Sequence, residues 1–275
     1  MRLWERTQKG VQMVESNLFG DGEAYELTMG RWSQLVGDKF IDWLDAPRGL
    51  RWLDVGCGNG AFTERIISCS APAEVVAIDP SKEQLAYAST RPGTKLAKFQ
   101  LGDAQKLPFA DGSFDAAVMA LVITFIPDPA RAVAEMVRVV RPGGWIATYM
   151  WDVPAGGPPS APFDAAMKSL DIPPATPPNS AAISRSDAMV AIWENAGLKS
   201  IDTRVIRILT HYANFDDFWN ANTLGIGPLG KALNEMTASV REQVRTRLRE
   251  QLAIGPDGGV TYEAFANAVK GRKPD

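Results

Sequence analysis

The feature that most constrains this chain is a short apolar segment that runs directly into a glycine-rich turn. Residues 50–55 predict a buried strand, Gly56, Gly58 and Gly60 follow within five residues, and a helical pattern starts at Ala61. Glycine lets the backbone turn sharply and approach a ligand closely, because it has no Cβ. The free amides at the start of the helix face the same place. This arrangement is typical of a site for a nucleotide-type cofactor.

An acidic residue at the end of this strand narrows the interpretation. Asp54 lies two residues before the first glycine, in an otherwise apolar run. A buried carboxylate is unfavourable unless it accepts hydrogen bonds or meets a cation. The pattern Gly56-x-Gly58-x-x-Ala61 also fits the dinucleotide fingerprint. From the residues alone, a tight turn without a ligand, a dinucleotide site and a site for a cationic cofactor therefore all stay open.

Strand and helix patterns alternate through the first half of the chain, after a helical segment over residues 31–44. Apolar strands that alternate with amphipathic helices indicate a mostly parallel sheet covered on both faces. The expected strands are residues 50–55, 74–79, 95–101, 114–121 and 145–151, and the expected helices are residues 61–70, 81–91 (with Ser81 as its N-cap) and 128–141.

The composition changes after Trp151, where eight of the nineteen prolines fall between Pro154 and Pro178. Such a segment is either a plain surface loop or a cover for a substrate site, since long loops after strand ends serve both purposes. Beyond it the patterns again predict regular elements. These are helices over residues 163–170, 186–196, 215–224 and 228–253, and strands over residues 200–210 and 260–269.

The glycine turn and the segments after it together resemble one enzyme family. Residues 53–60 resemble motif I of the class I S-adenosylmethionine-dependent methyltransferases, usually close to LDVGCGTG. Further matches are Gly102-Asp-Ala104, Leu107-Pro-Phe109 and Arg138-Val-Val-Arg-Pro-Gly-Gly144, which family members write as RVLKPGG. The resemblance covers residues 50–150 and extends more loosely to residues 25–33, as in bacterial members related to ubiquinone/menaquinone-type methyltransferases.

This resemblance implies an α/β, Rossmann-like fold with a seven-stranded sheet. The sheet would be mostly parallel with an antiparallel last strand, helices on both faces, and a helical cap. We expect a single methyltransferase domain over residues 1–275. Its parts would be an N-terminal helical segment (1–49), a cofactor-binding core (50–151), a Pro-rich insertion (152–182) and a helical cap between the last two strands (214–256).

The cofactor implied by the resemblance is S-adenosyl-L-methionine, which carries a sulfonium and an ammonium group. Asp79 ends the second strand, where an acid accepts hydrogen bonds from ribose hydroxyls in both dinucleotide enzymes and methyltransferases. Asp103 would bind the adenine amino group, and Tyr25 and Arg31 would reach the methionine end. The full set of expected cofactor residues is Tyr25, Arg31, Asp54, Gly56, Cys57, Gly58, Asp79, Pro80, Ser81, Asp103, Ala104, Ala120 and Leu121.

The catalytic residues and the methyl acceptor cannot be named from the sequence. Many relatives carry a histidine pair after the fourth strand, where this chain has Thr124 and Phe125, and its only histidine is His211. Methyl transfer from a sulfonium mainly needs positioning, and a base only if the acceptor must lose a proton. The missing histidine therefore favours an amine or a stabilised carbanion as acceptor. Expected pocket residues are Phe125, Trp151, Phe215 and Trp219, although Phe215, Phe218 and Trp219 equally fit a helix core.

Composition limits the remaining choices. A net charge of −3 gives no basic field for nucleic acid, and no Cys/His spacing indicates a metal. Without a signal peptide or a run of about 18 apolar residues, we expect a cytoplasmic protein with no membrane span, a small-molecule methyl acceptor, and a monomer or homodimer. The alternatives are a non-catalytic S-adenosyl-ligand-binding protein and an NAD-dependent oxidoreductase. The latter needs Tyr-x-x-x-Lys on the helix over residues 128–141, which has neither residue.

Overall fold

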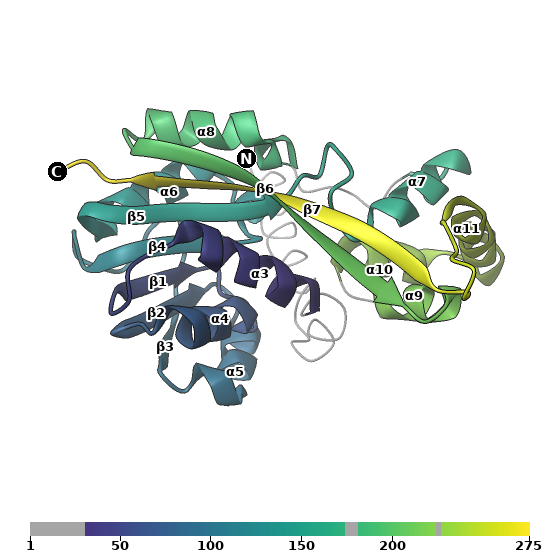
Figure 1. Ribbon diagram of the computed structural model, residues 1–275, viewed down its shortest axis with the longest axis horizontal. Coiled ribbons are helices and arrows are strands. Elements are labelled where there is room, and N and C mark those ends of the chain that lie inside the picture. The colour runs from purple at the N-terminus through teal and green to yellow at the C-terminus, as the bar shows by residue number, and fades with distance from the viewer. Residues whose placement is uncertain (1–30, 174–180, 224–226) are drawn as a thin grey trace, which may run out of the picture.

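A seven-stranded sheet runs through the centre of the structure, with the order β3-β2-β1-β4-β5-β7-β6 (Figure 1). This computed structural model describes residues 31–173, 181–223 and 227–275. The first five strands are parallel, and β7 is antiparallel to both of its neighbours. The strands are β1 (Arg51–Val55), β2 (Glu74–Asp79), β3 (Ala97–Leu101), β4 (Phe114–Ala120), β5 (Val140–Trp151), β6 (Lys199–Tyr212) and β7 (Val260–Arg272).

The strand order reverses between β1 and β4, which lie side by side. The chain moves outward in one direction from β1 to β3, and then returns to continue from β4 to β5 in the other direction. In open α/β sheets, ligands bind beyond the carboxyl ends of the strands at such a reversal. A ligand site is therefore expected at the loops after Val55 and Ala120.

Helices cover both faces of the sheet, as the alternating pattern predicts. α3, α4 and α5 lie on one face, and α6 and α8 lie on the other (Figure 1). Phe40 packs α3 against α4 and the sheet, because its ring lies 5.8 Å from that of Phe62 in α4 and 4.7 Å from that of Tyr149 in β5, measured between centroids. The helices are α3 (Arg31–Leu44), α4 (Ala61–Ser70), α5 (Lys82–Thr90), α6 (Pro129–Val139) and α8 (Ser186–Asn195), with 3₁₀ turns η2 (Pro92–Thr94), η3 (Ile123–Phe125) and η4 (Ala181–Ser184).

A helical cap stands beyond the carboxyl end of the parallel strands. Trp151, the last residue of β5, pairs with Ala266, so the preceding part of β7 pairs with β6 alone and forms a two-stranded ribbon. The cap lies at the far end of this ribbon (Figure 1). Phe163 stacks on Phe218 at 5.6 Å and an interplanar angle of 17°, which holds the cap together. Its helices are α7 (Ala161–Ser169), α9 (Phe215–Asn222), α10 (Gly227–Glu235) and α11 (Ala238–Gln251).

The structure corrects two of the expected elements. The helix predicted over residues 228–253 is two helices, because the Thr237 hydroxyl accepts a hydrogen bond from the Val240 amide and starts α11 anew. The helix predicted over residues 128–141 ends at Val139, and β5 starts at Val140 instead of residue 145. Val140 pairs with Phe114 in the sheet. Residues 140–144, which the sequence suggested as the end of the helix, therefore belong to the strand.

Candidate functional site

The glycine turn after β1 is held against the end of β2. The amides of Gly56 and Cys57 both donate to the Ile78 carbonyl, at 2.8 and 2.9 Å. Gly56, Gly58 and Gly60 have φ values of 75°, 51° and 80°, in the left-handed region that favours glycine. A Cβ on Gly56 would lie 2.6 Å from a Val122 methyl, whereas a Cβ on Gly58 would meet no described residue within 4 Å. Among the residues that the structure describes, Gly58 is therefore the point of the turn that faces open space.

Asp79 ties the end of β2 to this turn. Its two carboxylate oxygens accept hydrogen bonds from the Gly58 amide (2.9 Å) and the Ser81 amide (2.8 Å). Burial raises the pKa of Asp79, and the two amides act in the opposite direction. Each carboxylate oxygen can accept a second hydrogen bond. Asp79 thus fixes the turn and keeps acceptor capacity for a ligand hydroxyl.

Asp54 is the most unusual group of the site. It is a fully buried carboxylate, and only one of its two oxygens has a hydrogen-bond partner among the described residues. Its Oδ2 accepts a hydrogen bond from the Thr63 hydroxyl at 2.6 Å, and its Oδ1 has no hydrogen-bond partner within the described part of the chain. Burial raises the pKa of Asp54 to about 7, and the charge of Asp79 acts in the same direction. A cation that reached Oδ1 would compensate this cost.

Thr63 is a site residue that the sequence analysis missed. It is fully buried in the first turn of α4 and faces back onto β1, where its hydroxyl meets Asp54. The sequence did contain a signal for this contact. Thr63 is a hydroxyl residue in the first turn of the helix that follows the acidic end of β1. Ser81, in contrast, is the predicted N-cap, since its hydroxyl accepts from the Gln84 amide at 3.2 Å.

The other expected cofactor residues line the same edge of the sheet. Asp103 is exposed after β3 and closes a turn by accepting from the Gln105 amide at 2.8 Å, so its contact with adenine stays a prediction. Pro80 is exposed, and Ala104 and Ala120 are half-buried. Tyr25 lies outside the described residues, and so does the side chain of Arg31, whose backbone begins α3.

Cys57 in the glycine turn and Leu121 after β4 are the last two expected cofactor residues, and their contact with the cofactor stays a prediction. Cys57 is buried, which raises the pKa of its thiol well above the ordinary value, so the sulfur is neutral and a poor nucleophile. Leu121 adopts φ 61° directly after β4 and donates its amide to the Tyr149 carbonyl at 2.9 Å. A left-handed leucine is strained, and such strain gathers at functional edges. Leu121 turns the chain at the point where the strand order of the sheet reverses.

The expected acceptor residues fall into two groups. Phe125 is 44% exposed in η3, and Trp151 is buried at the end of β5, where its indole Nε1–H has no partner among the residues described. Phe215 and Trp219 are buried inside the cap, where guanidinium groups of α11 cover their rings. Phe125 and Trp151 thus lie at the strand ends, and a role of the cap aromatics in binding stays a prediction.

His211, possible metal ligands and possible membrane-spanning helices were the remaining features to place in the structure. His211 is exposed on β6, where its Nδ1 hydrogen-bonds with the Thr261 hydroxyl at 3.1 Å. Within the described residues, no three His, Cys, Asp or Glu side chains are grouped so as to hold a metal ion. None of the helices in the same part of the chain has the length and apolar character needed to cross a membrane.

Comparison with known proteins gives matches in sequence and in structure. Residues 53–148 match the family model described as a methyltransferase domain. Demethylmenaquinone methyltransferase of Renibacterium salmoninarum is 38% identical over 135 residues, which are 48% of this chain and 54% of that protein. The O-methyltransferase cnsE of Penicillium expansum is 31% identical over 185 residues, 64% of this chain and 63% of that protein. The chain thus spans under two thirds of the length of both relatives.

A solved structure supports the same fold. Phosphoethanolamine N-methyltransferase 2 of Haemonchus contortus, in complex with S-adenosyl-L-methionine, superposes with a TM-score of 0.53. The match covers 92% of this chain and 56% of that one, at 18% sequence identity. At this identity the likeness concerns the fold alone, which agrees with the sheet order and the loop positions described above.

Proposed function

This chain carries a class I S-adenosylmethionine-dependent methyltransferase domain, and we propose that the whole protein transfers a methyl group from that cofactor to a small organic acceptor. The observation that carries the proposal is the geometry around Gly58. An open backbone turn lies between two buried carboxylates, and one of their oxygens has no partner in the described residues. Such a site suits a ligand that has vicinal hydroxyls and a positive charge.

Each end of the cofactor has a matching group in this site. We assign the ribose hydroxyls to Asp79, whose oxygens retain acceptor capacity. We assign the cationic end to Asp54, whose bare Oδ1 needs a donor or a cation. Gly58 would let the backbone approach the ligand closely, since a side chain there would extend into the open space. Asp103 and Ala104, at the end of β3, are assigned to the adenine.

The residues of the chain would act mainly by positioning. The bound cofactor supplies a methyl group on a sulfonium, which is a good and neutral leaving group, so the protein must hold the acceptor in line and keep water out. Trp151 lies at the end of β5, on the acceptor side of the reversal point. Its indole N–H has no partner among the described residues, which supports a role in donating a hydrogen bond to an acceptor oxygen.

The acceptor class follows from the same features and from the relatives. One relative is named for demethylmenaquinone, a quinone-type acceptor, and the other is named for methyl transfer to oxygen. A buried indole donor with an exposed aromatic ring on the next loop suits an oxygen-bearing aromatic acceptor. We therefore propose a phenol- or quinol-type acceptor that binds as its phenolate and is held by Trp151 and Phe125. A phenolate has lost its proton before binding and is a stabilised carbanion at its ring carbons, which agrees with the absence of a histidine directly after β4.

Binding calorimetry with S-adenosylhomocysteine, S-adenosylmethionine, NAD⁺ and NADH tests the first part of the proposal. We expect binding of both S-adenosyl ligands and none of the nicotinamides. Asp79→Ala should weaken binding, and Asp202→Ala, an exposed carboxylate on β6, is the matched control that should not. Tight binding of NADH without an S-adenosyl response would refute the assignment.

Turnover is measured separately, as release of S-adenosylhomocysteine in the presence of phenols, quinols, amines and carboxylic acids. We expect release that depends on a phenol or quinol. Binding without turnover on any acceptor would favour the alternative of a non-catalytic S-adenosyl-ligand-binding protein. Turnover on amines alone would keep the enzyme but reject the acceptor class.

A further inference from the structure

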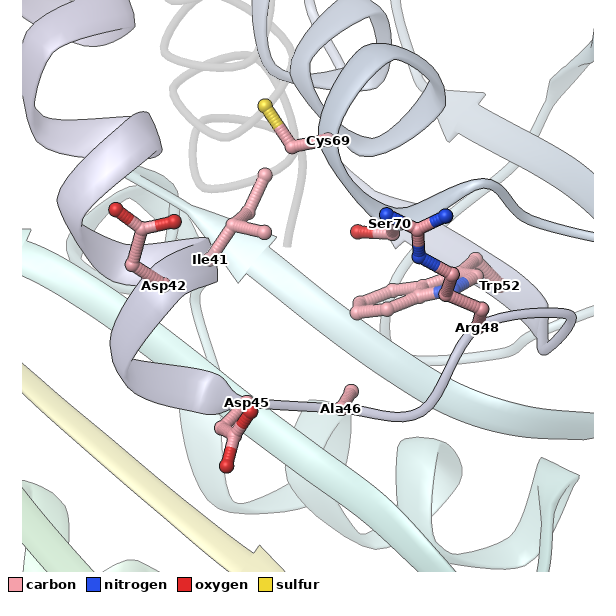
Figure 2. A pocket seen from close by; sticks show the side chains of 8 residues that line it. All are labelled: Ile41, Asp42, Asp45, Ala46, Arg48, Trp52, Cys69 and Ser70. Carbon is pink, nitrogen blue, oxygen red and sulfur yellow. The ribbon is translucent and has the colours of Figure 1, made fainter.

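A pocket opens at the amino end of β1, opposite to the glycine turn (Figure 2). Its volume is about 220 Å³, and it lies between the end of α3, the loop that leads into β1, and the end of α4. β1 and α4 both run between the two sites, with Trp52 and Ser70 at this pocket and Asp54 and Thr63 at the other end. The proposed methyl transfer makes no use of this pocket.

Two of the residues that line the pocket each carry a buried polar atom that lacks a hydrogen bond within the described part of the chain. Trp52 is fully buried and Ser70 is 5% exposed, yet neither the indole Nε1–H nor the Ser70 hydroxyl has a partner in the described ranges. Buried polar groups are almost always paired in native proteins, because an unpaired one loses its hydration without compensation. Two such groups on one small pocket therefore point to a ligand that pairs with them.

A positive charge lies on the same side of the pocket as these two groups. Figure 2 shows the Arg48 guanidinium in front of the Trp52 ring and next to the Ser70 hydroxyl in that view. Arg48 is exposed, and no carboxylate of the described residues forms an ion pair with it. A guanidinium, an indole N–H and a hydroxyl form a donor set that suits a carboxylate.

The other side of the pocket carries two carboxylates, Asp42 and Asp45 (Figure 2). Asp42 lies in the last turn of α3 and Asp45 directly follows the helix, while that turn has no basic residue. The carboxyl end of a helix carries a partial negative charge, so both acids are placed where they are disfavoured. Both are exposed and form no ion pair within the described part of the chain. A cation bound here would offset this repulsion.

We infer that this pocket binds a small zwitterion of amino-acid size. The ligand carboxylate would lie at Arg48, Trp52 Nε1 and the Ser70 hydroxyl, after Arg48 swings aside to uncover the two buried donors. The ligand ammonium would lie on the side of the pocket that carries Asp42 and Asp45. Ile41 and Ala46 line the pocket as well and supply an apolar wall for a short methylene chain.

The Trp52 indole N–H provides a direct probe of binding. The chain has eight tryptophans, so its ¹⁵N–¹H spectrum should contain eight indole signals, and Trp52→Phe identifies the signal of Trp52. The ligand probe is γ-aminobutyrate, and butyrate and butylamine are the controls that carry one charge each on the same carbon skeleton. We expect γ-aminobutyrate to shift the Trp52 signal saturably, and each control to bind at least about tenfold more weakly, a loss of about 1.4 kcal/mol.

Substitutions test the two halves of the pocket separately. Arg48→Gln should weaken γ-aminobutyrate binding about tenfold or more while butylamine binding stays unchanged, and the double change Asp42→Asn with Asp45→Asn should weaken butylamine and γ-aminobutyrate alike. Asp171→Asn is the matched control, because Asp171 is exposed and left-handed (φ 56°) as Asp45 is (φ 50°).

Several results would overturn the inference. These are a Trp52 signal that does not move, equal shifts of all indole signals, and butyrate that binds as tightly as γ-aminobutyrate. S-adenosylhomocysteine binding is measured on the same samples and should be unaffected by Arg48→Gln. Failure at this pocket is thereby separated from failure of the proposed function.

Discussion

Replacing Asp54 with asparagine should uncouple the stability of the ligand-free protein from pH. Asparagine keeps the size of the side chain, and its carbonyl can still accept the Thr63 hydroxyl, which in the wild type lies 2.6 Å from Oδ2. What it removes is the ionisable group, whose burial raises its pKa from 3.8 to about 7. The change therefore isolates the cost of ionising this one buried carboxyl.

The magnitude follows from the pKa shift. A rise from 3.8 to about 7 is roughly 3 pKa units, and at about 1.4 kcal/mol per unit this corresponds to about 4 kcal/mol. Because the folded pKa is raised, the protonated carboxyl contributes this stability in full below about pH 4. The contribution is lost as the pH rises through 7. The free energy of unfolding of the wild type should therefore fall by up to about 4 kcal/mol relative to Asp54→Asn over that interval.

The proposed cofactor reverses this cost. A positive charge at Oδ1 stabilises the ionised carboxylate, so binding below pH 7 releases a proton. The affinity for S-adenosylmethionine should rise up to about tenfold per pH unit between about pH 5 and 7 and level off above that range. In Asp54→Asn it should be weaker at pH 8 and nearly independent of pH.

Urea unfolding at a series of pH values, with and without S-adenosylhomocysteine, measures both effects. Asp202→Asn, an exposed carboxylate on β6, is the control and should follow the wild type. Parallel pH profiles for the wild type and Asp54→Asn would refute the argument, because they would mean that the carboxyl ionises in the folded protein without cost.

Three other predictions concern the two ends of the site. Asp79→Ala should weaken S-adenosylhomocysteine binding at least tenfold in calorimetry, since a charge-assisted hydrogen bond contributes about 1.5–3 kcal/mol; unchanged affinity would place the ribose elsewhere. Gly58→Val should abolish S-adenosylhomocysteine binding, because a β-branched residue is strained at φ 51° and its side chain enters the space that the ligand needs. Cys57→Ser should retain binding, and loss of turnover in Cys57→Ser would give the thiol a role. Trp151→Phe should raise KM for the acceptor about tenfold without changing cofactor affinity, and an unchanged KM would remove Trp151 from the acceptor site. Because Trp151 is buried, the smaller side chain should also lower the unfolding midpoint, which is measured alongside.

Much of the fold could be predicted because the local signals agree with the tertiary structure. The strand before the glycine turn, the Ser81 cap and the alternation up to Trp151 are all encoded within a few residues. The position of Asp54 in an apolar strand indicated a carboxylate that needs hydrogen bonds or a cation. In the structure its Oδ1 lacks a partner within the described residues.

The features that escaped prediction depend on contacts between distant residues. Asp115 binds Arg51 through Oδ2 at 3.1 Å and Arg141 through Oδ1 at 2.6 Å, and such pairing helps to hold residues 140–144 as strand where the local sequence suggested a helix end. The break at Thr237 was hidden because Val240, Val244 and Leu248 continue the apolar spacing of the preceding helix.

The role of the cap aromatics could not be predicted from the local sequence either. Phe215, Phe218 and Trp219 fit a pocket and a helix core equally well in sequence. Phe218 and Trp219 pack against Phe163, which lies in the Pro-rich insertion more than 50 residues before them. No local pattern contains that partner.

The strand order also has a consequence for how the protein assembles during synthesis. β7 lies between β5 and β6 in the sheet, although it follows both in the chain. Until the ribosome has produced residues 260–272, β5 and β6 therefore expose facing edges with unpaired amides and carbonyls. Such edges invite pairing with the wrong strand or with another chain. Completion of the sheet by late insertion of β7 predicts that nascent chains stalled before residue 260 depend on chaperones, and that a peptide of β7 added in trans would restore the missing pairing.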